Sequence, residues 1–159
     1  MEAIFLKHRW HAVIGLCFFI ACLSSCKSQL DLREAFTKVS EMELFEIEEY
    51  NSDIYGFPES FGDAIVCTHP NSSCRKKVLD VLARLPKEWL VLEVAVDGQL
   101  DRFYISSNTT SDNLLFVHIG KGSGDTVLIL FSNANLSEVQ NVLDKIKEQT
   151  ATVHCHDRL

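Results

Sequence analysis

Basic residues are scarce in this chain of 159 residues. Lys and Arg together number 15, against 22 Asp and Glu, which gives a formal net charge of −7. Proteins that bind DNA or RNA carry a basic surface that neutralises phosphates. The shortage of basic side chains therefore argues against nucleic acid as a partner. It also leaves the protein without electrostatic attraction to an anionic membrane surface.

The N-terminal apolar run is too short to cross a bilayer. Residues 12–23 (AVIGLCFFIACL) carry no charge, but a helix needs about 20 residues to span the hydrocarbon. Lys7 and Arg9 precede this run and polar residues follow it, which is the order of zones in a secretory signal peptide. We therefore expect residues 1–25 to be a leader that directs export.

Motifs that assemble known catalytic sites are also missing. The chain has no Gly-x-Ser-x-Gly elbow and no Cys–His nucleophile signature. The stretch HIGKGSGDT (residues 118–126) has Leu115 where a phosphate-binding loop needs its first glycine, and a strand rather than a helix should follow it. We read its three glycines as a hairpin connection. The sequence predicts no catalytic residues, no metal site and no cofactor.

The end of the leader contains a cysteine in a distinctive context. Leu23-Ser24-Ser25-Cys26 resembles the bacterial lipobox, in which the cysteine receives lipid and becomes the mature N-terminus. The resemblance implies that residues 26–31 are a lipidated N-terminus and linker, and that Cys26 attaches the protein to a membrane. Several acyl chains hold a protein stably on a bilayer. We therefore expect the protein in the bacterial cell envelope. Lys27-Ser28-Gln29 lacks the acidic run that is associated with export to the cell surface in related bacteria, so we expect the periplasm-facing side of the outer membrane.

Three cysteines follow the lipobox, at positions 67, 74 and 155. An oxidising compartment favours disulfides, and Cys67 and Cys74 would close the shortest loop, worth about 2.5 kcal/mol by loop entropy. They are the disulfide candidates. Pairing of either with Cys155 stays open, and so does the alternative that both thiols pack as small apolar groups.

Hydrophobic periodicity predicts one α+β domain over residues 32–149, followed by a tail at 150–159. Helical spacing covers residues 30–40, 73–85 and 136–148. Strands are predicted within residues 41–50, on both sides of the turn at Asp97-Gly98, and in the apolar runs NLLFVHI and TVLILF. We read residues 51–63 as a loop. The expected architecture is an antiparallel sheet of about four to five strands with helices packed on one face.

The second half of the chain resembles a known family. The stretch VDGQLDRFYIS…DNLLFVHIGKGSGDTVLILFSNANLSEVQNVLDKI is similar to the C-terminal half of the Bacteroidetes lipoproteins grouped as domain of unknown function 4252. Those proteins combine a lipoprotein leader with a strand hairpin, two further strands and a last helix. This chain has FSNAN where the family has a glycine that ends the strand. The resemblance implies fold and location, and it brings no established activity.

Three function classes remain for comparison. The leading expectation is a non-catalytic binding or accessory module, and its partner could be a protein or a glycan held by the acidic, aromatic segment of residues 41–63. A metal-assisted hydrolase would need Cys67, His69 and Cys74 to meet His154 and His156. The sequons at Asn71, Asn108 and Asn135 would accept glycans if the chain were a eukaryotic secreted glycoprotein. His118 is expected to be an ordinary core or sheet-face histidine.

Overall fold

The computed structural model describes residues 29–50, 56–106 and 111–156, with the backbone alone for residues 150–156. Its described strands form one antiparallel sheet in the order β1-β2-β6-β5-β4-β3. They are β1 (Glu46–Tyr50), β2 (Asp63–His69), β3 (Leu90–Val96), β4 (Gln99–Ile105), β5 (Asp112–Ile119) and β6 (Thr126–Ser132). The α+β class with an antiparallel sheet is confirmed. The strand count is six, however, and not four to five.

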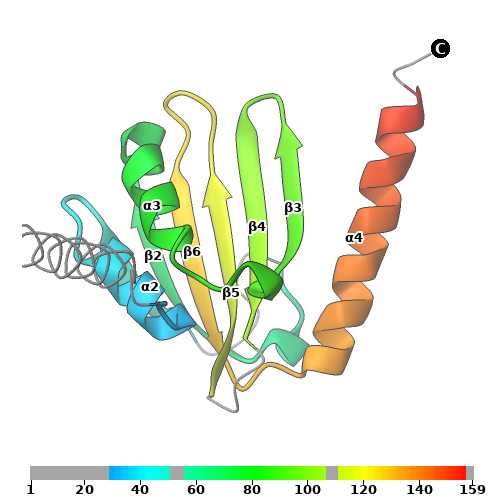
Figure 1. Ribbon diagram of the computed structural model, residues 1–159, viewed down its shortest axis with the longest axis horizontal. Coiled ribbons are helices and arrows are strands. Elements are labelled where there is room, and N and C mark those ends of the chain that lie inside the picture. Colours follow the sequence, from blue (N-terminus) through cyan, green and yellow to red (C-terminus); the bar gives the residue numbers. More distant parts are fainter. Residues whose placement is uncertain (1–28, 51–55, 107–110, 157–159) are drawn as a thin grey trace, which may run out of the picture.

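The helices lie on both faces of the sheet, as Figure 1 shows. Helices α2 (Leu32–Ser40) and α3 (Arg75–Leu82) cover one face, and α4 (Leu136–His156) stands on the other. The prediction of helices on a single face was therefore wrong. Its physical cause lies in β6, where Leu128 and Leu130 pack toward α2 and α3 while Val127 and Ile129 pack toward α4. A strand that is apolar on both faces needs a cover on each.

Two separate cores result from this arrangement. The first, called here the α2–α3 core, joins the buried faces of those helices to one side of the sheet; its largest members include Leu32, Phe36, Trp89, Tyr104, Leu115, Leu128 and Leu130. The second, called the α4 core, lies on the other side of the sheet and contains Phe61, Phe103, Leu114, Ile129, Phe131, Val139 and Leu143. The central strands β5 and β6 contribute to both cores, because they are apolar on both faces.

The β3–β4 hairpin turns at Asp97 and Gly98, whose φ angles of 50° and 87° fit the two-residue turn that the sequence predicted. A two-residue turn at these positions predicts the pairs Leu92–Phe103, Glu93–Arg102 and Leu90–Ile105, and the first two are confirmed. Leu90 lies opposite Tyr104 instead, because a register shift falls between Leu90 and Leu92. A bulge of this kind cannot be deduced from turn chemistry.

Helix boundaries differ modestly from the predictions. Helix α2 begins at Leu32 because Asp31 caps it: the Asp31 carboxylate accepts from the Glu34 backbone N–H at 2.7 Å, and the Glu34 carboxylate accepts in return. A short 3₁₀ turn, Ser72–Cys74, precedes α3. Helix α4 continues to His156, beyond the predicted end near residue 148. The Asn135 side chain binds the Glu138 carboxylate at 2.8 Å where α4 begins.

Several predicted features lie outside the described residues. They are the leader, the lipobox cysteine Cys26, the sequon at Asn108 and the side chains of His154, Cys155 and His156. Within the part of the chain that the structure describes, no helix is both long enough and apolar enough to cross a membrane.

Candidate functional site

A groove of about 440 Å³ opens on the α4 face of the sheet, at the end where the β3–β4 and β5–β6 turns lie. Its floor comes from alternate residues of three neighbouring strands, because side chains that point to one face recur at every second position. The lining residues are Phe57, Gln99, Asp101, Phe116, His118, Gly120, Gly124, Asp125, Val127 and Ile129. This volume lies within the range of about 300–1,000 Å³ typical of small-molecule sites.

Aromatic rings form the deep end of the groove. Phe57 reaches over the sheet from the segment before β2, and its ring centroid lies 5.2 Å from that of Phe116 and 6.2 Å from that of Phe103. Phe103 and Phe116 are themselves 4.7 Å apart across strands β4 and β5. Edge-to-face and tilted packing at these distances is favourable. The rings therefore present a rigid apolar surface, and Phe57 and Phe116 stay partly accessible.

Asp101 and His118 provide the polar end of the groove. They are direct cross-strand partners in β4 and β5, and His118 Nδ1 lies 2.6 Å from Asp101 Oδ1. Because an ionised carboxylate can only accept, the Nδ1–H of His118 donates to Asp101. The His118 side chain is 30% exposed and that of Asp101 is 37% exposed. Together with the amide of Gln99 they present hydrogen-bonding groups beside the aromatic rings.

The rim of the groove depends on two glycines in the β5–β6 connection. A Cβ atom at Gly120 would lie 2.7 Å from the carbonyl carbon of Gly124, so no larger residue fits without movement. The Gly120 N–H donates to Asp125 O at 2.8 Å and the Gly124 N–H to Lys121 O at 2.9 Å. The hairpin predicted from these glycines is confirmed, and β6 follows it directly. Gly120 and Gly124 of this tight turn line the end of the groove.

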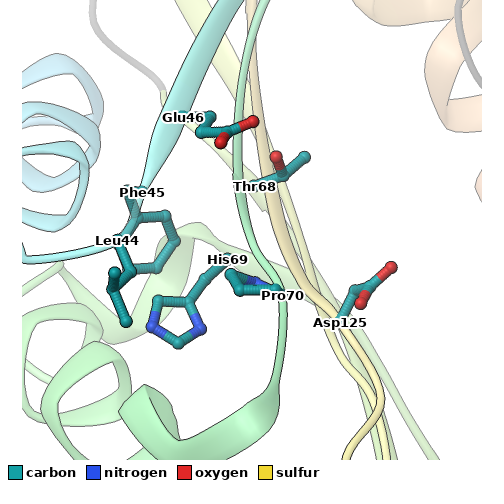
Figure 2. A pocket seen from close by; sticks show the side chains of 7 residues that line it. All are labelled: Leu44, Phe45, Glu46, Thr68, His69, Pro70 and Asp125. Atoms are coloured by element: carbon teal, nitrogen blue, oxygen red, sulfur yellow. The ribbon is translucent and has the colours of Figure 1, made fainter.

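A second hollow of about 360 Å³ lies at the ends of β1 and β2 (Figure 2). Leu44, Phe45 and His69 gather on one side of the strands, and Thr68 and Asp125 lie on the other. The rings of Phe45 and His69 are 5.0 Å apart. Asp125 lines both this hollow and the groove, so the two depressions adjoin at the start of β6.

Cys67 and Cys74 both belong to the α2–α3 core. The structure holds them as free thiols, so the bridge between them stays a prediction about the oxidised protein. Burial raises the pKa of the Cys67 thiol to about 12. A thiol that stays protonated is a poor nucleophile and a poor metal ligand.

The described residues gather no three His, Cys, Asp or Glu side chains that could hold a metal ion. Cys67 and Cys74 pack as core residues, and His69 Nδ1 lies 2.8 Å from the carbonyl oxygen of Asn71. The three described residues of the hydrolase hypothesis, Cys67, His69 and Cys74, therefore form no metal site by themselves. The side chains of His154 and His156 lie outside the described residues. The hydrolase hypothesis gains no support from these residues.

Sequence reasoning missed the groove because its parts are distant in the chain. His118 was expected to be a sheet-face histidine, which it is, but Asp101 was not identified as its partner. The alternation of β4 placed Asp101 and Phe103 on one face; the missing information was the register between β4 and β5, whose connection has no turn motif. Phe57 was assigned to a loop, and nothing in the sequence indicated its contact with the sheet.

Comparisons with protein-family models, with curated proteins and with solved structures found no match to this chain. The function is therefore argued from the fold and the groove.

Proposed function

We propose that this protein is a lipid-anchored binding module of the bacterial cell envelope, and that the groove holds a neutral ligand with hydroxyl groups and an apolar face. The observation that carries the proposal is the groove itself, which joins the rings of Phe57 and Phe116 to the His118–Asp101 pair. A concave site with an apolar lining and a few convergent polar groups is the usual form of a small-molecule site.

The chemistry of the lining favours a sugar. Aromatic rings pack against the apolar C–H face of a pyranose, and carboxylate, imidazole and amide groups bind its hydroxyls. Asp101 and Asp125 give the groove acidic character, which disfavours an anionic ligand. A neutral saccharide meets both conditions.

Saturation-transfer NMR with cellotriose, maltotriose and chitotriose would test the groove. We expect at least one trisaccharide to receive saturation from the wild type and to lose most of it with His118→Ala and Gln99→Ala, because both side chains line the groove and neither is fully buried. Tyr50→Ala is the control, since Tyr50 is an exposed aromatic residue away from the groove. No transfer to any of the three sugars, or transfer that His118→Ala leaves unchanged, would refute this part of the proposal.

The anchor and the location rest on the lipobox resemblance of Cys26 and on the similarity to the Bacteroidetes lipoproteins. Cells would be labelled with an alkyne fatty acid and would express either the wild type or Cys26→Ala. We expect label on the wild type only. A wild-type protein without label would refute the anchor while leaving the groove proposal open to its own test.

A further inference from the structure

Strand β1 forms one edge of the sheet. Among the described strands it pairs only with β2, and each of its five residues is exposed. The outer N–H and C=O groups of an edge strand can hydrogen-bond to a further strand. Recognition by strand addition uses this property: backbone bonds supply affinity and alternate side chains supply specificity.

Exposed apolar side chains concentrate at this edge. Among the described residues the large exposed ones are Leu44 (69%), Ile47 (55%), Tyr50 (37%) and Val96 (46%), and the first three belong to β1 or the turn before it. Leu44 also has a φ of 68°, a left-handed conformation that strains a residue with a side chain. A strained and exposed leucine contributes little to stability, and strain of this kind concentrates at functional sites.

The hollow in Figure 2 lies where β1 begins, with Leu44 at its margin. His69 lines it and is only 3% exposed. Its Nδ1 contacts the Asn71 backbone. The other ring nitrogen, Nε2, is left to bind a polar group of a ligand in the hollow. The hollow can therefore accept the end of a segment that runs along β1.

Charge determines which segment fits. Glu46, Glu48 and Glu49 lie on β1, and residues 39–74 contain no Lys or Arg. If β1 pairs antiparallel with a second copy of itself over three or more residues, at least one glutamate lies opposite another. The same holds for in-register parallel pairing. Like charges opposite each other destabilise a sheet. The edge thus repels its own copy and favours a strand of opposite charge.

We propose that β1 is a docking edge for an extended, cationic segment of a partner protein, which adds to the sheet beside β1. Lys or Arg side chains of that segment lie beside Glu46 and Glu48, which share the α4 face of the sheet. An apolar side chain lies beside Ile47 on the opposite face. One end of the segment enters the hollow between Leu44 and His69. The hollow shares Asp125 with the groove, but the β1 edge lies outside the groove and the proposal does not depend on a saccharide.

A fluorescent nonapeptide of alternating lysine and valine, with blocked ends, is the probe, and its anisotropy is followed with the full chain in detergent micelles. We expect saturable binding that weakens about tenfold in the Glu46→Lys, Glu48→Lys double variant. Two attractive cross-strand pairs then become repulsive, and like charges directly opposite each other destabilise the pairing of strands. Asp80→Lys with Glu88→Lys is the matched control, because it changes the charge equally at exposed positions on α3 and before β3.

Backbone pairing is tested with the same peptide N-methylated at every residue, because successive N–H groups of an extended strand point to opposite edges. It keeps the charge but cannot donate to β1, so its binding should be lost. Equal affinity of the methylated peptide, or equal weakening in both double variants, would overturn the proposal by showing simple charge attraction. Light scattering tests whether a second copy of this chain occupies the edge instead. A wild-type dimer that Glu48→Lys disrupts would show that it does, and would also overturn the proposal.

Discussion

The ion pair between Arg33 and Asp112 fastens α2 to the end of the sheet, and its removal gives a sharp test of the fold. Arg33 donates to both carboxylate oxygens of Asp112, with Nη2 lying 2.8 Å from Oδ1. The Ser132 hydroxyl donates to the same carboxylate at 2.6 Å. Asp112→Asn leaves the shape unchanged but removes the charge and one acceptor oxygen.

The expected loss follows from burial. The Asp112 side chain is 11% exposed and that of Arg33 is 54% exposed. Hydrogen bonds to charged groups contribute about 1.5–3 kcal/mol, and the half-exposed guanidinium recovers part of this from water in the variant. We therefore expect Asp112→Asn to lower the free energy of unfolding by about 1–2 kcal/mol, measured by urea denaturation at pH 7.

Two comparisons make this prediction refutable. Asp144 forms an exposed pair with Lys147 at 3.2 Å, so Asp144→Asn should change stability by less than about 0.5 kcal/mol. The hydrogen bonds from Arg33 hold the pKa of Asp112 below its ordinary value of 3.8. Its contribution is therefore complete above that value and is lost as the pH falls through the lowered native pKa. Wild type and Asp112→Asn should converge in acid; a gap that persists in full at pH 2, or an equal loss in Asp144→Asn, would refute the reasoning.

Gly62→Ala should destabilise far more than Gly56→Ala in denaturant titrations, because both glycines have φ near 80° but only at Gly62 would a Cβ meet backbone, 2.1 Å from Ser132 O; equal losses would contradict this. Leu143→Ala should lower the free energy of unfolding by about 3 kcal/mol, since Leu143 is fully buried in the α4 core; a loss below 1 kcal/mol would contradict that packing. Native Cys67 should resist iodoacetamide at pH 8, because burial raises its pKa to about 12. Rapid alkylation of the native protein would contradict its burial. Mass spectrometry without reduction would show whether Cys67 is bridged to Cys74.

Local chemistry predicted the second half of the fold well. The Asp97-Gly98 turn fixed the β3–β4 register over most of its length, and the two-sided apolar runs of β5 and β6 indicated central strands. The first half was harder. β2 was missed because its sequence, DAIVCTH, contains a cysteine that suggested a loop bridge, and because β6, the central strand it pairs with, lies far along the chain.

The face of the sheet that each helix covers could not be predicted, because it depends on the path of the connecting segments and not on the composition of the helix. Leu136, Val139, Leu143 and Ile146 are the apolar positions that predicted the last helix, and all four lie in or against the α4 core. Nothing local to these residues specifies which side of the sheet they cover. The groove shares this limitation, since it forms where α4 and Phe57 leave one end of the sheet face open. Its residues have ordinary sheet patterns in sequence.

The strand order has a consequence for how the chain can fold. Strands β3 to β6 form a meander in which each pairs with its neighbour in sequence, so this part can assemble from local contacts. The β1–β2 hairpin joins the sheet only through β6, with Asp63 opposite Ser132. An emerging chain therefore makes this hairpin early but has no place for it until the last strand has appeared. Until β6 is available, β2 and Cys67, which is buried in the folded protein, stay unprotected, and thiol chemistry and wrong strand partners compete with folding during that interval.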